Sequence, residues 1–340
     1  MTGAALKKRQ SVLTFLCVVG LVSVAATDEA AVYVRDAARS HRARHAVPHH
    51  AHHATRTIVT VTGWYGRLGN NLHQIRQATK VAFCCQGVLQ LPDSHYMLNM
   101  TQSAFDLGHG VPIGQMCPRD ISDEFFFIHQ MRGGAQRVHH ECDADVDDIW
   151  RAITDSLFPR PAHLCATHGT PDCCPPDMDD VLVAHVRSGD LFSLKEPSKD
   201  YFPAPLVYYT QVMTERNWSR VVLVTEDELN PITTILGKVM KGALTSPVQV
   251  FSQRLEDDVH MLRCAVHVAI ARSTFSERLA ALAPNLRTVY SAYTKACPKK
   301  NLTGVSYSFP NFNDTYWAHT PDQISDMVRQ SDVVRQPYVC

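Results

Sequence analysis

The chain of 340 residues is 45% hydrophobic, and its 33 basic and 33 acidic residues give a formal net charge of zero. A chain of this length can bury a large core and predicts more than one domain. The balanced charge provides no strongly basic surface, so we expect no nucleic-acid partner.

The N-terminal residues predict a membrane or secretion segment. Lys7-Lys8-Arg9 precedes an uncharged, mainly apolar run over 11–26. This pattern is typical of a signal-anchor, which would hold the chain in a membrane, and of a cleavable signal peptide, so residues 1–26 leave both open. Residues 27–56 are rich in histidine, alanine and arginine and predict a solvated stem or linker.

Cysteines and glycosylation sequons both favour an oxidising lumenal environment. All eleven cysteines except Cys17 lie beyond the apolar segment, which leaves an even number for disulfides whose pairing is open. No Cys-x-x-Cys pair occurs in the sequence, so zinc ribbons and thioredoxin-like chemistry are not supported. Four sequons predict N-glycosylation, at Asn99, Asn217, Asn301 and Asn313.

Residues 57–180 predict an N-terminal α/β domain. Its first strand is β-branched and is followed by a glycine-rich turn, and its end is a connection rich in proline and cysteine. The expected elements are a strand over 57–62, the turn 63–71, a helix over 71–86, a strand over 88–91, a loop-rich stretch over 93–124, a strand over 124–129, a helix over 145–157 and the connection 159–176.

Residues 181–295 alternate strands and helices regularly, which predicts a parallel sheet covered on both faces. The tail, 296–340, shows little periodicity except near 321–328. The expected strands are 181–186, 220–225, 248–251, 265–271 and 287–290, and the expected helices are 205–217, 231–241, 255–263 and 275–283.

Charged residues follow the strand expected over 181–186. Arg187 and Asp190 stand in the turn His185-Val-Arg-Ser-Gly-Asp190, at the carboxyl end of that strand. Ligands bind at this end of open α/β sheets, and an arginine beside turn amides suits a phosphate or diphosphate. An ordinary ion pair between Arg187 and Asp190 is an equally good interpretation of this stretch alone.

Three further polar stretches lie at expected strand ends. The glycines of 63–69 fit a dinucleotide turn, but no tyrosine here has lysine four residues on, as the corresponding dehydrogenases require. Glu226-Asp227 offers acceptors for a nucleoside, or charges that stabilise the following helix. Ser273-Thr-Phe-Ser276 offers hydroxyls and amides for an anion, or ordinary helix capping.

Patterns for metal sites and hydrolases are weak. Asp143-Ala-Asp145 and Asp145-Val-Asp147 follow a polar run, so we interpret them as an exposed acidic helix start. No His-Glu-x-x-His motif and no Gly-x-Ser-x-Gly motif occurs in the sequence. We therefore expect neither a metal nor another cofactor.

Together, Gly66-Arg-Leu-Gly-Asn-Asn71, His185-Val-Arg-Ser-Gly-Asp190 and Ser273-Thr-Phe-Ser276 resemble, in order and spacing, motifs of GDP-fucose-dependent fucosyltransferases. The group that they resemble most is the α-1,2-fucosyltransferases, in a superfamily with protein O-fucosyltransferases and α-1,6 enzymes. The resemblance spans 57–295. It implies a GT-B-like α/β fold of two Rossmann-like domains with parallel sheets, in which 57–180 is the acceptor side and 181–295 binds the donor.

The resemblance also implies a function. The chain would be an inverting, metal-independent glycosyltransferase that moves fucose from GDP-fucose to a hydroxyl of a glycan or glycoprotein. It would act as a lumenal domain at the Golgi membrane, with the ER lumen or secretion as alternatives. Negative charge develops on the departing GDP, and Arg187 with oriented amides would stabilise it. Asp190 would take part in catalysis beside Arg187 or would only orient the Arg187 side chain. The sequence does not identify the catalytic base.

Residue roles follow from the matched motifs. Arg187 would bind the diphosphate, Asn70 would lie by the sugar or diphosphate, and Asp227 resembles an acid that contacts the donor. Arg187 and Asp190 are the expected catalytic residues. The expected donor-binding residues are Gly69, Asn70, His185, Arg187, Asp227, Ser273, Thr274, Phe275 and Ser276.

Three positions depart from the family pattern. Ser188 replaces a second arginine, Asn71 replaces glutamine, and Glu277-Arg278 replaces a tryptophan pair. These departures leave the acceptor and the linkage open. Two other classes also remain as alternatives: a lumenal GDP-sugar-binding protein or inactive relative without transfer activity, and a secreted structural glycoprotein. The regular alternation after residue 181 argues against the second.

Overall fold

The computed structural model describes residues 56–340 with several gaps. The segment 1–26 and the stem, apart from Arg56, lie outside the described residues, and so does Asn313. Among the described helices, none is long and apolar enough to cross a membrane. The gaps are 109–116, 127–129, 160–164, 167–172, 195–201, 244–245, 252–253, 294 and 313–316.

The N-terminal part is built on a four-stranded sheet with the order β3-β2-β1-β4. β1 pairs in parallel with β2 and β4, whereas β3 is antiparallel to β2. Its elements are β1 (Ile58–Val61), α2 (Leu68–Cys84), β2 (Val88–Gln90), β3 (Ala104–Asp106), β4 (Asp120–Asp123), α3 (Gly134–Glu141) and α4 (Asp147–Leu157).

The C-terminal part is built on a seven-stranded sheet with the order β11-β10-β9-β8-β5-β6-β7, and all its pairs are parallel except β10–β11. The described chain is thus a mixed α/β structure in which parallel pairing predominates, as expected, and it is compatible with Rossmann-like folds. The elements are β5 (Val181–Val186), α6 (Asp190–Ser193), α7 (Leu206–Thr214), β6 (Arg220–Thr225), α8 (Pro231–Ala243), β7 (Val248–Phe251), α9 (Leu255–Arg263), β8 (His267–Ile270), α10 (Thr274–Leu282), β9 (Thr288–Ala292), β10 (Thr303–Ser308), α11 (Pro321–Arg329) and β11 (Val334–Val339).

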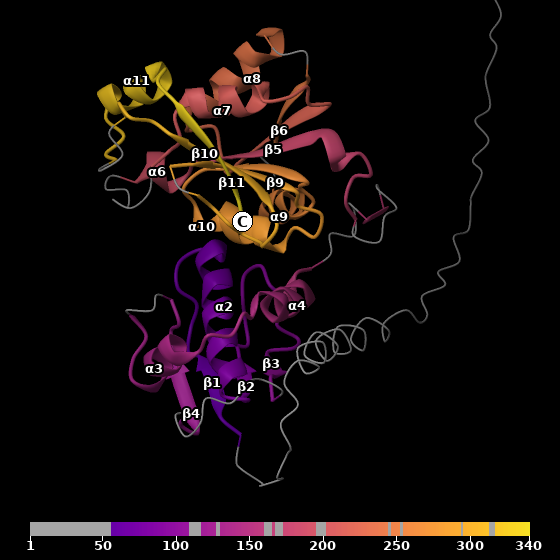
Figure 1. Ribbon diagram of the computed structural model, residues 1–340, viewed down its shortest axis with the longest axis vertical. Coiled ribbons are helices and arrows are strands. Elements are labelled where there is room, and N and C mark those ends of the chain that lie inside the picture. Colours follow the sequence, from indigo (N-terminus) through magenta and orange to yellow (C-terminus); the bar gives the residue numbers. More distant parts are fainter. Residues whose placement is uncertain are drawn as a thin grey trace, which may run out of the picture.

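The second sheet is buried on both faces, because its central strands β5, β6 and β8 are apolar at most positions. On β5, Val181 and Val183 join one core, whereas Leu182, Ala184 and Val186 join another. Helices α7, α8 and α11 lie above the sheet in Figure 1, and α9 and α10 lie below it, towards α2. The lower core continues into the N-terminal part, so the two sheets share apolar packing.

The N-terminal ends of α2 and α10 meet at the junction of the two parts (Figure 1). A Cβ at Gly69 would lie 2.4 Å from the backbone nitrogen of Phe275, so this contact between backbones requires glycine. Thr274 Oγ1 also donates to Asn70 Oδ1 across the junction, at 3.0 Å. Two motifs that lie about 200 residues apart in the sequence are thereby brought into direct contact.

The strand predicted over 124–129 is wrong for the residues that the structure describes there. The strand is β4, four residues earlier, and 127–129 lie outside the described residues. Phe125 has a φ of 56°, which a strand cannot accommodate, and it is fully buried in the irregular segment that follows β4. Asp123 ends the strand, because its carboxylate accepts from the backbone N–H groups of Glu124 (2.8 Å) and Arg132 (2.6 Å).

The tail is more regular than predicted, since β10 and β11 extend the second sheet beyond β9. β11 is exposed along most of its length and contains Pro337, as a strand at a sheet edge can, so it lacks an apolar pattern. In β10, Gly304 leaves room for the ring of Tyr338, to which a Cβ would approach within 2.2 Å. Pairing between β10 and β11 therefore gives regular structure to a segment whose sequence shows no clear strand pattern.

Some boundaries also differ. α2 begins at Leu68 rather than residue 71, because Gly66 ends the turn with a φ of 70° and Asn70 N–H already bonds the Arg67 carbonyl at 2.9 Å. α4 begins at Asp147, and α3 has no counterpart among the predicted elements because few of its residues are apolar.

All ten described cysteines form disulfides, which confirms the expectation from their even number and supplies the pairing. Two adjacent cysteines, Cys173 and Cys174, hold the connection before β5, and Cys174 ties it to the end of α9. The sequon asparagines Asn99, Asn217 and Asn301 are all exposed. The pairs are Cys84–Cys142, Cys85–Cys117, Cys165–Cys173, Cys174–Cys264 and Cys297–Cys340.

Candidate functional site

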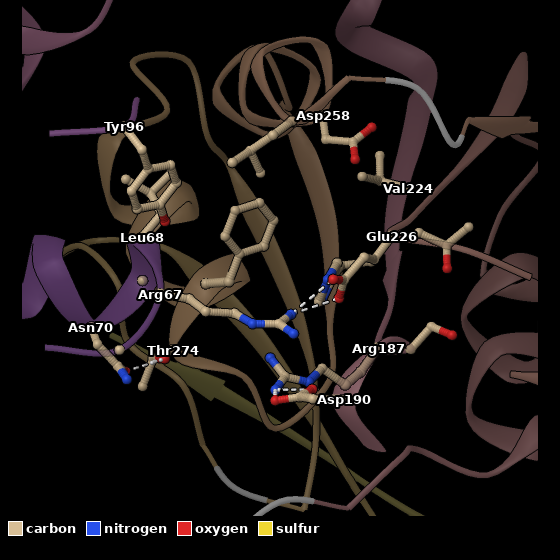
Figure 2. Close-up of a pocket in the computed structure, with 17 residues that line it drawn as sticks. Arg67, Leu68, Asn70, Tyr96, Arg187, Asp190, Val224, Glu226, Asp258 and Thr274 are labelled. Carbon is tan, nitrogen blue, oxygen red and sulfur yellow. Dashed lines mark hydrogen bonds and ion pairs between the residues drawn. The ribbon is translucent and has the colours of Figure 1, made fainter. Parts of the chain in front are cut away.

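A cleft of about 590 Å³ opens between the start of α2 and the carboxyl ends of β5 and β6. Figure 2 shows its lining, with the α2 residues facing those of the second sheet. Ligands of open α/β structures bind at this end of the strands, which makes the cleft the candidate site. The lining residues are Gly66, Arg67, Leu68, Gly69, Asn70, Tyr96, His185, Arg187, Ser188, Asp190, Val224, Thr225, Glu226, Leu255, Asp258, Thr274 and Phe275.

Arg187 is the central cation of the second-sheet wall. Its Nη2 donates to both carboxylate oxygens of Asp190, at 2.8 and 3.1 Å, and its Nη1 donates to Ser273 Oγ at 3.2 Å. Only 12% of the Arg187 side chain is exposed. The ion pair considered from the sequence is therefore present, and it fixes the guanidinium at the cleft (Figure 2).

The turn after β5 depends on Gly189. Its φ is 59°, and a Cβ there would lie 1.9 Å from Glu226 Oε2. Ser188 Oγ donates to Asp227, whose Oδ1 also accepts from Leu229 N–H at 3.0 Å. Asp227 thus holds the turn and is not a lining residue, whereas its neighbour Glu226 lines the cleft.

The side chains of Ser273 to Ser276 lie in three different environments. Ser273 accepts the bond from Arg187, and Thr274 and Phe275 line the cleft at the first turn of α10. Ser276 is fully buried and does not line the cleft. The helix start therefore offers the site backbone amides and Thr274 rather than three hydroxyls.

His185 is a neutral ring in the cleft wall. Burial, with a contribution from Arg187, lowers the pKa of His185 to about 3. Its ring lies 5.5 Å from that of Phe275 between centroids. At neutral pH the ring therefore carries no charge, and it packs against the start of α10.

Arg67 lies across the cleft from Arg187 and was missed as a candidate. Its Nη1 donates to both carboxylate oxygens of Glu226, at 2.9 and 2.7 Å, and both side chains are about half exposed. This pair joins the N-terminal part to the end of β6 (Figure 2). The only sequence signal was its place inside the motif Gly66-Arg-Leu-Gly-Asn-Asn71.

Two buried amides of α2 shape the glycine turn that carries Arg67. Gln74 accepts from Tyr65 N–H at 2.8 Å and donates to the carbonyls of Gly63, at 3.0 Å, and Glu124. Asn71 donates to the Tyr65 carbonyl at 3.0 Å. These side chains satisfy the backbone of a loop that has no regular structure of its own.

The far end of the cleft is apolar apart from one carboxylate. Leu255 and Asp258 come from α9 and Val224 from β6, whereas Tyr96, from the loop after β2, lies beside Leu68 on the α2 side of the cleft (Figure 2). Asp258 is buried, with 6% of its surface exposed. Neither Asp258 nor Tyr96 has a motif around it, which is why the sequence did not indicate them.

The acidic residues considered for a metal lie elsewhere. Asp145 pairs with Lys300 and Asp147 with Arg76, and none of these lines the cleft. Among the described residues, one group has the spacing of a metal site: Cys174, His260 and Cys264. Its two cysteines form a disulfide, so they offer no thiolate to a metal.

No family model matches the chain, and no curated protein is significantly similar to it. The interpretation of the cleft therefore rests on its residues and their geometry.

Proposed function

We propose that this chain is an inverting glycosyltransferase that moves fucose from GDP-fucose to a glycan hydroxyl without a metal ion. The observation that carries the proposal is Arg187, which stands at the carboxyl end of β5 and bonds Ser273 at the start of α10. A fixed guanidinium and a helix N-terminus at one end of the cleft suit a diphosphate.

Departure of GDP is the step that this end of the cleft assists. Negative charge develops on the diphosphate as the bond to fucose breaks, and Arg187 is charged at any physiological pH. Asp190 engages Arg187 through both carboxylate oxygens, so we assign Asp190 to hold the guanidinium in place. The amides of Thr274 and Phe275, at the first turn of α10, add partial positive charge.

The opposite end of the cleft suits a guanine base. Phe275, Leu255 and Val224 supply apolar contacts, and Asp258 places a carboxylate beside them. A carboxylate accepts from the adjacent N1–H and N2–H donors of guanine, whereas adenine presents an acceptor at N1. Asp258 thus takes the donor-contacting role that the sequence suggested for Asp227.

The acceptor approaches from the side of α2 in this proposal. Arg67 and Asn70 line that side and offer hydrogen bonds to sugar hydroxyls, and Glu226 meets Arg67 there from the end of β6. Inversion requires the attacking hydroxyl to lie opposite the diphosphate, and the α2 wall faces the wall that bears Arg187 (Figure 2). The use of residues from both sheets accords with a GT-B-like arrangement of an acceptor domain and a donor domain.

The proposed location is the lumen of the secretory pathway, at the Golgi membrane if the N-terminal segment is an anchor. The disulfides fit an oxidising compartment, and the exposed sequon asparagines fit N-glycosylation. Digestion of protein from secretory cells with an N-glycosidase is expected to lower its apparent mass.

Arg187→Ala tests the donor site directly. The substitution removes the guanidinium that faces the diphosphate, so we expect at least a roughly hundred-fold loss of transfer from GDP-fucose, comparable to loss of an oxyanion donor. Arg187→Lys is expected to restore little, because an ammonium lacks the planar fork that bonds Asp190 and Ser273 together. The measurement is kcat/KM with thermal unfolding of each variant.

Binding without transfer would identify the alternative, a GDP-sugar-binding protein. Thermal shifts with GDP, GDP-fucose, GDP-mannose and UDP separate guanine recognition from general nucleotide binding, and release of GDP over time separates turnover from binding. Near-normal transfer by a folded Arg187→Ala protein would contradict the assignment of the diphosphate site.

A further inference from the structure

Two tyrosines of the N-terminal part, one in the cleft lining and one next to it in the sequence, are unusually exposed. Tyr65 is 49% exposed and Tyr96 is 61% exposed, and no other tyrosine, tryptophan or phenylalanine is exposed to this extent among the residues whose side-chain exposure is described. Tyr96 lines the cleft, and Tyr65 directly precedes the lining residues Gly66 and Arg67. Exposed aromatic rings beside a binding cleft indicate contact with a ligand.

Each of the two tyrosine rings packs against another ring of the N-terminal part. Tyr96 stacks on His95, with centroids 4.5 Å apart and planes 22° apart, and its hydroxyl lies beside the backbone of Leu68. Tyr65 packs against the buried Phe126, with centroids 4.4 Å apart. Each ring is thus held with surface open to solvent, so little side-chain entropy is lost when a ligand covers it.

His95 is itself fixed as a neutral ring. Its Nδ1 accepts from the backbone N–H groups of Met97 (2.9 Å) and Leu98 (3.0 Å), so the proton must reside on Nε2. Nε2–H then donates to Asn71 Oδ1 at 3.0 Å. Burial lowers the pKa of His95 to about 4, which keeps this arrangement intact at neutral pH.

Asn71 ties the two tyrosine segments together. Its Oδ1 accepts from His95, which supports Tyr96, and its Nδ2 donates to the Tyr65 carbonyl at 3.0 Å. Asn71 is fully buried at the start of α2. The asparagine that departs from the family pattern therefore links the two tyrosine segments.

The chemistry around the two tyrosines suits a pyranose ring. One face of many pyranosides is a patch of C–H groups, which favours the electron-rich face of an aromatic ring, and the ring edge carries hydroxyls. Arg67 and Asn70 line the cleft beside Tyr96 and can bond those hydroxyls. A peptide helix or an acyl chain would instead need a longer apolar groove without such charged groups.

We propose that Tyr65 and Tyr96 form a stacking shelf for the acceptor, a hexopyranoside that presents a C–H face. Asn71 holds the two tyrosine segments in position relative to each other. The inference rests on the proposed transferase function, and it adds the acceptor subsite. It places the acceptor sugar against the N-terminal part, with its attacking hydroxyl directed into the cleft.

The test uses the purified full chain and four variants: Tyr65→Ala, Tyr96→Ala, Tyr96→Phe and, as control, Val334→Ala. Val334 is 52% exposed on the edge strand β11 and belongs to no part of the cleft. Transfer from GDP-fucose is measured against an oligosaccharide acceptor, and GDP binding is measured by thermal shift. Ligand-observed saturation-transfer NMR follows methyl β-D-galactopyranoside, methyl β-D-glucopyranoside and methyl α-D-mannopyranoside.

We expect Tyr96→Ala to raise the acceptor KM at least ten-fold and Tyr65→Ala at least three-fold, with GDP binding changed less than two-fold. Tyr96→Phe should retain the wild-type KM within about three-fold, because the ring face remains. At least one methyl glycoside should receive saturation on its C–H face, and Tyr96→Ala should abolish it.

Several results would overturn the shelf. An unchanged acceptor KM in both alanine variants would do so while leaving the transferase function intact. Weaker GDP binding in Tyr96→Ala would assign the ring to the nucleobase, and transfer to a deglycosylated protein but to no sugar would make the partner a peptide. If the wild-type chain transfers no fucose, the proposed function fails, and the NMR result alone then decides whether sugars bind the shelf.

Discussion

The two walls of the cleft are built in different ways. The second-sheet wall places Arg187 and Glu226 directly after strands β5 and β6, and the register of six parallel residue pairs between them fixes both positions. The α2 wall carries Arg67 on a turn that has no sheet neighbour and depends on bonds from Gln74 and Asn71. Strand register therefore sets the place of the first wall, and the side chains of Asp227 and Asn230 only hold the turn that follows it, whereas the second wall has no strand register and depends on buried side chains.

Because of this difference, we expect substitutions to affect the two walls to different extents. A wall fixed by backbone hydrogen bonds tolerates changes in its side chains, because strand pairing does not depend on them. A wall fixed by amide side chains changes shape when one of them changes. In the proposed enzyme the constant donor meets the first wall and the variable acceptor meets the second, which lets specificity change without loss of the donor site.

The largest effect is expected where the two walls touch. Gly69→Ala would place a Cβ within 2.4–2.7 Å of the backbone of Thr274 and Phe275, so α2 and α10 must move apart. We expect a loss of roughly 1–3 kcal/mol of unfolding free energy from this overpacking, together with at least a ten-fold loss of transfer. Thermal and denaturant unfolding with transfer kinetics measure both.

Gly63→Ala is the matched control for that substitution. A Cβ at Gly63 meets no atom within 4 Å, and Gly63 has no left-handed φ. Stability and activity should therefore stay near those of the wild type. Equal losses at Gly63 and Gly69 would show that the contact between the helices is not the cause.

A smaller and more selective effect is expected from buried amides on opposite walls. Gln74→Leu removes the hydrogen-bond partner of the Tyr65 N–H and of the carbonyls of Gly63 and Glu124. Asn230→Leu removes a hydrogen bond of 2.8 Å to the Arg187 carbonyl. Each change should lower the unfolding free energy by about 1–3 kcal/mol, the usual penalty for unsatisfied buried groups.

Their kinetic effects should differ. Gln74→Leu is expected to raise the acceptor KM more than the donor KM, and Asn230→Leu is expected to do the reverse. The measurement is both KM values for each variant, at a temperature where both proteins are folded. Identical kinetic profiles would mean that the two walls are not separate binding surfaces.

Acid should weaken the fold through its buried histidines. Burial lowers the pKa values of His73 and His185 to about 3 and those of His95 and His139 to about 4, from 6.5. Below pH 6.5 the unfolded chain binds protons that the folded chain does not, so the unfolding free energy should fall as the pH drops towards 4. Denaturant unfolding at pH 7.5, 6, 5 and 4 measures the slope.

His139→Gln provides the comparison for this slope. His139 contacts Gln77 in the N-terminal core, away from the cleft, so its removal should make the pH dependence shallower without changing the residues of either wall. An unchanged slope between pH 6.5 and 4 in this variant would assign the acid sensitivity to other groups.

The smallest effects are expected from the acidic residues before α4. Asp143→Ala and Asp145→Ala should leave stability and transfer within the range usual for surface substitutions, because Asp145 pairs with the exposed Lys300 and neither aspartate lines the cleft. Transfer should also persist in excess EDTA after dialysis. Loss of activity that manganese restores would favour a metal-dependent mechanism over the proposed one.

Local patterns in the sequence were enough to predict the second sheet and the strand end that bears Arg187. The runs over 181–186 and 220–225 are apolar at nearly every position, so they predict buried parallel strands, and Arg187 follows one of them directly. The Ser273 stretch was likewise indicated by its place between a strand and a helix. Such signals are local, because strand burial and the residue after a strand are both visible in a short window.

The α2 wall, the contacts of Asp227 and the strands of the tail could not be predicted in this way. Arg67 meets Glu226 across 159 residues, and Asp227 turns to Ser188 rather than into the cleft. β11 acquires its structure by pairing with β10, since its own residues are mostly exposed. These outcomes depend on contacts between distant segments, whose free energies are absent from any local pattern of residues.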